Sequence, residues 1–203
     1  MNLAALLTKM GVPTDRGLFL VYGKAGTGKT TFLMELAKES MGKIFVVDSE
    51  NGFNIERFGQ ISGGEAELSR LLVTKSKDFE DQANIISNVL NNEKLFDFIG
   101  VDTIGKNYRE PSREDRTKAN NEIARQMRIL KEISRTKPVV VCNQVYQNIN
   151  ANKVEPVGSN YVTKWCDYVI MLDYANDKRF LRIERPKKEK FEFTLSDNGF
   201  TFA

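Results

Sequence analysis

The chain has 203 residues, of which 41% are hydrophobic and 28% are charged, and its formal net charge at pH 7 is +3. These values are typical of one globular α/β domain, so we expect a single domain over residues 1–203, with residues 1–16 as a short N-terminal lead-in. The absence of histidine excludes histidine-based acid–base chemistry and histidine metal sites. Neither a basic leader nor an apolar run of about 18 residues is evident, so we expect a cytoplasmic protein that does not enter a membrane.

Alternating strands and helices are predicted for the first half of the chain. Short apolar runs indicate buried strands, and apolar residues at a spacing of three to four indicate helices. The elements expected here are a strand at 18–22, a helix at 29–40, strands at 43–48 and 71–73, a helix from about Asp78, and a strand at 96–102. This order predicts parallel strands joined by helices.

A different pattern follows in the second half. The polar stretch 105–118 precedes an amphipathic helix that ends before Pro138, and residues 146–163 show no periodicity, which predicts a long loop. The strands expected in this half are 138–142, 167–172, 179–184 and 191–195, with a turn at 197–199. Closely spaced strands of alternating polarity predict antiparallel pairing at the C-terminal end.

Positive charge is concentrated in residues 178–190, which carry seven Lys and Arg side chains against two Glu side chains. Such a segment is more often a solvated strand edge that discourages edge pairing than a nucleic-acid site. Composition alone therefore leaves both interpretations open.

The strongest chemical signal is a P-loop at residues 23–30, placed between a predicted strand and a predicted helix. In that position backbone N–H groups and the positive end of the helix dipole meet a phosphate anion. We expect ATP as the ligand, with Lys29 on its β- and γ-phosphates and the Thr30 hydroxyl on Mg²⁺. The expected nucleotide-binding residues are Gly23, Lys24, Ala25, Gly26, Thr27, Gly28, Lys29, Thr30 and Thr31.

Two acidic residues follow predicted strands, at the edge where open α/β sheets form their ligand crevice. Asp102 closes the strand at 96–102 and is a candidate for holding the water shell of Mg²⁺. Glu50 follows the strand at 43–48 and is a candidate for polarising the attacking water, although such residues also cap the next helix. From the residues alone, both roles of Glu50 remain open.

With these motifs in order, the chain resembles the ATPase core of the RecA family, and most specifically its short archaeal paralogues, the RadB family. The matching segments are residues 46–58, 101–109, 140–145 and 156–160, and the overall match runs from about 18 to 200. The resemblance implies a RecA-like α/β fold. Its central sheet would be mostly parallel and flanked by helices, with antiparallel strands at the C-terminal end.

The resemblance also implies roles for residues that spacing alone does not assign. Glu50 would be the catalytic glutamate, Gln144 would sense the γ-phosphate, and Arg57 would lie against the adenine. Together with Lys29, Glu50 and Gln144 form the implied catalytic set. Two DNA-binding loops would follow the strands that end near Asp102 and Gln144. Their basic candidates for contact with the phosphate backbone are Lys106, Arg109, Arg113, Arg116, Lys118, Lys153 and Lys164.

The function implied by the resemblance is that of an accessory protein in DNA repair and homologous recombination. Such a protein binds ATP, Mg²⁺ and single-stranded or branched DNA, hydrolyses ATP weakly, and acts as a mediator of the main recombinase. Because the chain begins close to the ATPase core, we expect that an oligomer can form but that a filament does not. An open alternative is a KaiC-like, ATP-regulated protein-interaction or signalling module without DNA binding. A small-molecule P-loop kinase is disfavoured because no arginine-rich lid is evident.

Overall fold

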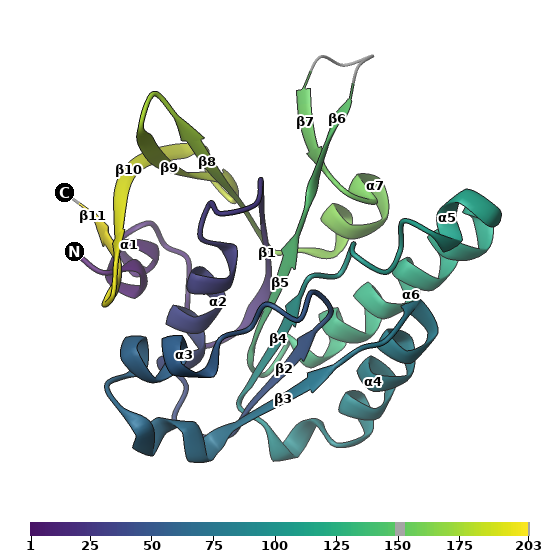
Figure 1. The fold of residues 1–203 in the computed structure, drawn as a ribbon, viewed down its shortest axis with the longest axis horizontal. Coiled ribbons are helices and arrows are strands. Elements are labelled where there is room, and N and C mark those ends of the chain that lie inside the picture. The colour runs from purple at the N-terminus through teal and green to yellow at the C-terminus, as the bar shows by residue number, and fades with distance from the viewer. Residues whose placement is uncertain (149–152, 203) are drawn as a thin grey trace.

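A nine-stranded sheet forms the centre of the computed structural model, which describes residues 1–148 and 153–202 (Figure 1). The strand order is β11-β10-β9-β8-β1-β5-β4-β2-β3. The six parallel strands are β1 (Gly17–Gly23), β2 (Ile44–Asp48), β3 (Leu71–Lys75), β4 (Phe98–Asp102), β5 (Pro138–Asn143) and β8 (Tyr168–Ala175). The antiparallel strands are β9 (Lys178–Arg185), β10 (Glu189–Ser196) and β11 (Gly199–Phe202). The predicted RecA-like fold, with a mostly parallel sheet and antiparallel C-terminal strands, is confirmed.

Helices cover both faces of this sheet. On one face lie α1 (Leu3–Lys9), α2 (Lys29–Lys38) and α3 (Ile55–Ser62), and on the other lie α4 (Phe79–Asn91), α6 (Arg116–Ile133) and α7 (Ser159–Val162). Alternate side chains of β1 enter the two cores, with Phe19 and Val21 on one side and Leu18 and Leu20 on the other. Because both faces are buried, the central strands are continuously apolar.

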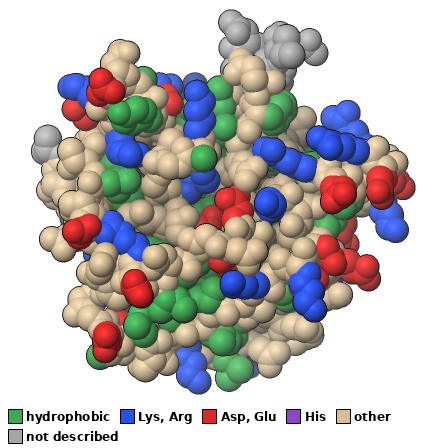
Figure 2. Space-filling model, viewed as in Figure 1, with side chains coloured by type: hydrophobic (Ala, Val, Ile, Leu, Met, Phe, Trp, Pro, Cys, Tyr) green, Lys and Arg blue, Asp and Glu red, His purple; other side chains and the backbone are tan. Residues whose placement is uncertain are grey.

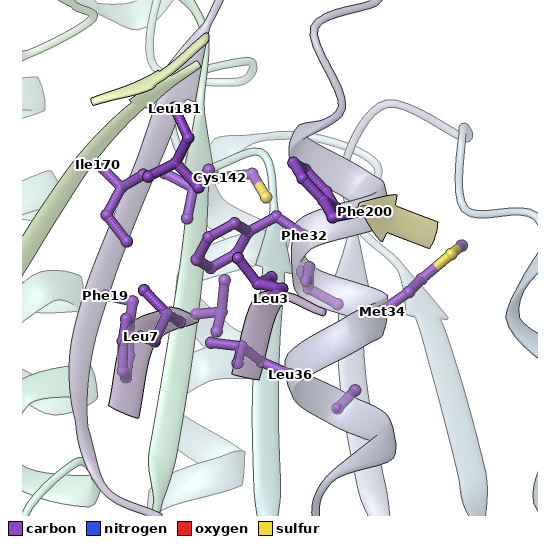
Figure 3. Close-up of a cluster of buried hydrophobic side chains, with 14 of the residues drawn as sticks. Leu3, Leu7, Phe19, Phe32, Met34, Leu36, Cys142, Ile170, Leu181 and Phe200 are labelled. Carbon is purple, nitrogen blue, oxygen red and sulfur yellow. The ribbon is translucent and has the colours of Figure 1, made fainter. Parts of the chain in front are cut away.

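Side chains from distant parts of the chain meet in the core under α1 and α2 (Figure 3). Phe32 of α2 packs edge-on against Phe200 of β11, with ring centroids 6.1 Å apart. The ends of the chain are also close, since the Met1 amino group donates to the Phe202 carbonyl oxygen at 2.9 Å. The C-terminal strands are thereby held against the helix that follows the P-loop.

Polar side chains cap the beginnings of four helices, including α1, where Asn2 accepts from the Ala5 amide at 2.9 Å. The predicted cap Asp78 accepts a hydrogen bond from the Asp81 amide at 2.8 Å, which starts α4. Asn54 and Asp115 cap α3 and α6 in the same way. Each cap satisfies one amide that the first helical turn leaves without a partner.

Several predicted loops contain regular structure. Residues 146–163, expected to be a loop, contain the antiparallel pair β6 (Val145–Asn148) and β7 (Lys153–Pro156), followed by α7 and the 3₁₀ turn Thr163–Trp165. Among the described strands these two pair only with each other, and they stand off the main sheet (Figure 1), so no buried face imposes an apolar pattern. Similarly, the polar stretch 105–118 contains α5 (Pro111–Glu114) and the first residues of α6.

Two 3₁₀ segments, Glu65–Arg70 and Glu93–Leu95, complete the described chain. The predicted N-terminal lead-in contains α1. None of the helices in the described ranges is long and apolar enough to cross a membrane.

Candidate nucleotide-binding site

The P-loop lies at the carboxyl end of β1 and leads directly into α2. Gly26 and Gly28 have φ angles of 74° and 107°, in the left-handed region that favours glycine. A side chain at Gly28 would come within 3.0 Å of Leu195. None of the described side chains caps α2, whose N-cap is Gly28 itself. The amide groups at this helix end therefore meet the requirement for a phosphate-binding site.

The ammonium group of Lys29 is held inside this loop. Its Nζ donates to the carbonyl oxygens of Gly23 and Lys24 at 3.1 and 3.0 Å, and the residue is only 9% exposed. The Thr27 hydroxyl donates to the same Lys24 carbonyl at 2.9 Å. Neutral carbonyl oxygens compensate the charge of a buried ammonium group only partly, so a bound anion would stabilise it strongly. This arrangement therefore suits a polyphosphate.

An oxygen pair suited to Mg²⁺ lies beside the loop. The Thr30 hydroxyl donates to Asp102 Oδ2 at 2.5 Å, which joins the start of α2 to the end of β4. The pKa of Asp102 is raised to about 6, mainly by burial and also by the nearby carboxylates of Glu50 and Asp48, against the opposing effects of Thr30 and Lys29. A hydroxyl and a carboxylate are ligands that Mg²⁺ prefers. The residues present therefore fit the ion.

Glu50 is joined to the ends of two other strands. Its Oε1 accepts hydrogen bonds from the Thr103 hydroxyl at 2.9 Å and from Gln144 Nε2 at 2.5 Å. The cap of the following helix is Asn54, so the alternative capping role of Glu50 is not what the structure shows. Thr103 follows Asp102, and Gln144 follows β5. The structure thus brings together the three sheet-edge residues that the sequence singled out, Glu50, Asp102 and Gln144.

The turn that carries Glu50 is built by a buried neighbour, Asp48. Its carboxylate accepts hydrogen bonds from the amides of Glu50, Gly52 and Phe53 at 3.1, 3.2 and 3.0 Å. Asp48 is 2% exposed. Sequence analysis assigned no role to this residue, although an acid at the end of a buried strand and two positions before another acid was a usable signal.

A buried polar network lies beneath this turn. The Ser49 hydroxyl donates to Gln82 Oε1 at 2.9 Å and accepts from the Ser76 hydroxyl at 2.8 Å, and Gln82 Nε2 donates to Gln126 Oε1 at 2.8 Å. Asn107 Nδ2 donates to the Ser76 hydroxyl at 3.1 Å. The network connects the Glu50 turn with α4, α6 and the segment after β4.

Arg57 is fixed at the turn between β10 and β11. Its guanidinium donates to the carbonyl oxygens of Ser196 and Asp197, the latter at 2.9 Å. This turn follows Leu195, whose side chain lies next to Gly28 of the P-loop. The predicted contact of Arg57 with the adenine stays a prediction.

The basic segment 178–190 is largely engaged within the chain. Lys178 pairs with Glu192 at 2.9 Å, and Arg182 pairs with Asp173 at 3.1 Å. Arg179 donates to the Gly26 carbonyl oxygen at 2.7 Å and therefore touches the P-loop, a contact that the sequence could not predict without the strand order. These contacts favour the structural interpretation of this segment.

The predicted DNA-binding residues fall into separate places. Arg109, Arg113 and Arg116 line one cavity of about 640 Å³ beside the β6–β7 hairpin. Lys118 lines a different cavity between α4 and α6, and the Lys164 ammonium lies 5.4 Å from the centre of the Trp165 ring. Lys106 is exposed outside these two linings. The side chain of Lys153 lies outside what the structure describes, as do residues 149–152.

The sheet order, the P-loop between β1 and α2, and the carboxylates at the ends of β2 and β4 define a RecA-like P-loop fold. A family model described as an AAA domain matches residues 18–190, most of the chain. The class of protein is therefore a P-loop nucleotide-binding core.

Individual relatives give a narrower assignment. A protein named DNA repair and recombination protein RadB from Pyrococcus abyssi is 34% identical, over 94% of this chain and 87% of that protein. Its namesake from Thermococcus sibiricus is 30% identical, over 98% and 91% of the two chains. A crystal structure of the RadB recombinase superposes with a TM-score of 0.84 at 28% identity, covering 98% of this chain and 96% of that one. The chain belongs to the RadB family.

Proposed function

We propose that this protein is an accessory factor of DNA repair and homologous recombination, in which ATP occupancy sets the affinity for DNA and hydrolysis is slow. Its relatives are named DNA repair and recombination proteins, which supports the cellular process. The observation that carries the proposal is the hydrogen bond between Glu50 and Gln144. It joins the nucleotide side of the sheet to the residue immediately before the β6–β7 hairpin.

The nucleotide would be held by groups from the P-loop with α2, from α3 and from β4. Lys29 and the backbone amides of residues 26–30 bind the phosphates, and Arg57 lies along the adenine. Thr30 and Asp102 hold Mg²⁺, which when bound neutralises charge on the phosphate oxygens.

Glu50 and Gln144 would connect the phosphate end of the site to the hairpin. A γ-phosphate oxygen competes for the Gln144 amide, and Glu50 then loses a hydrogen-bond partner. The freed carboxylate oxygen would orient a water molecule and accept its proton, while the water oxygen bonds to the γ-phosphorus and the bond to the departing ADP oxygen breaks. Because Val145 follows Gln144 directly, reorientation of the amide moves the first residue of β6.

DNA would bind beside the same hairpin. Arg109, Arg113 and Arg116 supply contacts to the phosphate backbone, with Lys106, Lys118, Lys153 and Lys164 around them. Arg109 already bridges to β6 through the Val145 carbonyl oxygen, at 3.5 Å. The partners are therefore single-stranded or branched DNA, and the main recombinase that shares this substrate.

Titration of a labelled single strand at several salt concentrations, with and without a non-hydrolysable ATP analogue, tests this function. Three phosphate contacts predict that log affinity falls with log salt at a slope of about −2. The analogue should change the affinity by about 5-fold or more. Absence of DNA binding at low salt would contradict the proposal and favour an ATP-regulated protein-interaction module instead.

A further inference from the structure

Arg179 connects the basic segment 178–190 to the P-loop. It lies near the start of β9, and its guanidinium donates to the Gly26 carbonyl oxygen at 2.7 Å. The hairpin of β8 and β9 rises next to the loop that precedes α2 (Figure 1). The contact therefore places a positive charge at the edge of the candidate nucleotide site.

The charge of Arg179 is not neutralised in the way that the charges of its neighbours on β9 are. Lys178 and Arg182 are each paired with a carboxylate, at 2.9 and 3.1 Å. Arg179 forms no ion pair with any residue in the described ranges, and its bond to Gly26 is to a neutral carbonyl. A guanidinium in this state gains most from a nearby anion.

Two neighbours hold the Arg179 guanidinium in place and leave most of its donors over. It lies 5.2 Å from the centre of the Tyr174 ring, whose hydroxyl donates to Asp177 at 3.1 Å. A guanidinium carries five N–H donors in a planar fork, and the bond to Gly26 takes one of them. Because the side chain is partly exposed, donors remain for a ligand beside the loop.

A nucleotide at the P-loop would lie close to negative charge of the protein. Asp48 and Asp102 are in register at the ends of β2 and β4, and Glu50 follows two residues after Asp48. Figure 2 shows Asp and Glu side chains at the centre of this face, with Lys and Arg side chains around them. Lys29 supplies a cation within the loop. A further cation at the edge of the loop would stabilise bound phosphates.

We propose that Arg179 is a further phosphate-binding residue of the nucleotide site, supplied by the same chain that carries the P-loop. Its remaining N–H groups donate to phosphate oxygens, and its charge offsets part of the charge of the polyphosphate. This inference rests on the proposed function, because it takes ATP as the ligand of the P-loop. The alternative is that Arg179 only ties β9 to the loop, a role that needs no positive charge.

Removal of the charge tests the assignment directly. Arg179→Met keeps an unbranched side chain and should weaken binding of ATP with Mg²⁺ by about 10- to 150-fold, the range for loss of one hydrogen bond to a charged group. Arg179→Lys keeps the charge and should lose less. Isothermal titration measures both. Inorganic tripolyphosphate, which has no base or ribose, should show the same order of affinities when it competes with ATP.

A matched control and the salt dependence separate phosphate binding from a structural tie. Arg182→Met lies on the same strand, at a cation already paired with Asp173, and should keep the parent affinity. Because salt screens charges, the difference in ATP affinity between the parent and Arg179→Met should shrink as the salt concentration rises. A tie to a neutral carbonyl predicts a difference that salt does not change. Circular dichroism confirms that each variant is folded.

The possible failures are distinguishable. Parent affinity for ATP in Arg179→Met, equal losses in Arg179→Met and Arg179→Lys, or a loss that salt does not change would overturn the role of Arg179 while the nucleotide site stood. No binding of ATP by the parent would overturn this role together with the proposed function.

Discussion

Asp102 is a buried carboxyl group placed among other acids, and its position favours function over stability. It is 4% exposed, and burial raises its pKa to about 6 from an ordinary value of 3.8. Between about pH 4 and 6 the folded protein binds more protons at this residue than the unfolded chain does. The contribution of Asp102 to stability therefore falls as pH rises through this interval, and stays reduced above it.

Asp102→Asn should stabilise the nucleotide-free protein. Asparagine can still accept the Thr30 hydrogen bond, and one pKa unit corresponds to about 1.4 kcal/mol, so the gain at pH 7.5 is at most about 3 kcal/mol. Urea unfolding without Mg²⁺ should show this gain at pH 7.5 and a smaller one near pH 4. The same variant should bind nucleotide more weakly in the presence of Mg²⁺. A variant less stable than the parent at pH 7.5 would contradict the conclusion that ionised Asp102 lowers the free energy of unfolding.

Lys29→Ala should abolish nucleotide binding, because Lys29 is the cation that the P-loop holds within its carbonyl groups. Isothermal titration with ATP and Mg²⁺ measures the loss. Lys38→Ala removes a lysine at the other end of α2 and should bind normally. Unchanged ATP affinity in Lys29→Ala would refute the P-loop assignment.

Glu50→Gln should retain nucleotide binding and lose ATP turnover. The amide oxygen can accept the bonds from Thr103 and Gln144, but it is a far weaker base than a carboxylate. Phosphate release under single-turnover conditions measures the effect. If the variant turns ATP over at the parent rate, another residue activates the water.

At the scale of elements, the sequence predicted those strands and helices whose buried side chains recur at a regular spacing. Strands β1, β2, β4 and β5 are covered on both faces and appear as apolar runs. The β6–β7 hairpin has no such covering, so its pattern gave no signal. The first turn of α6 was missed for a related reason, because its polar residues lie beyond the apolar face that identified the helix.

The edge strand β11 should be important for stability because it packs onto α2. Phe200 is 2% exposed, and its ring lies 4.5 Å from that of Phe193. Phe200→Ala should lower the free energy of unfolding by about 3–5 kcal/mol, measured by urea denaturation. Met41→Ala, at a residue that is 94% exposed, should change it by less than about 0.5 kcal/mol. Similar small losses in both variants would show that β11 does not stabilise the core.

For the whole molecule, local motifs were predictable and contacts between distant strands were not. The motif at residues 23–30 is local in the sequence, so the position of this loop between a strand and a helix was predictable, and nucleotide binding there stays a prediction. The Glu50–Gln144 bond was not predictable from spacing, because it depends on β4 lying between β2 and β5. The same holds for Arg179, which reaches Gly26 only because β8 separates β9 from β1.

The central claim is that the Glu50–Gln144 contact couples nucleotide occupancy to DNA affinity. The most direct test is the single-strand dissociation constant with and without a non-hydrolysable ATP analogue, in the parent and in Gln144→Ala. The account predicts a change of about 5-fold or more in the parent, an equal reciprocal change in nucleotide affinity when DNA is present, and little change in Gln144→Ala. The same DNA affinity with and without nucleotide in the parent would contradict it.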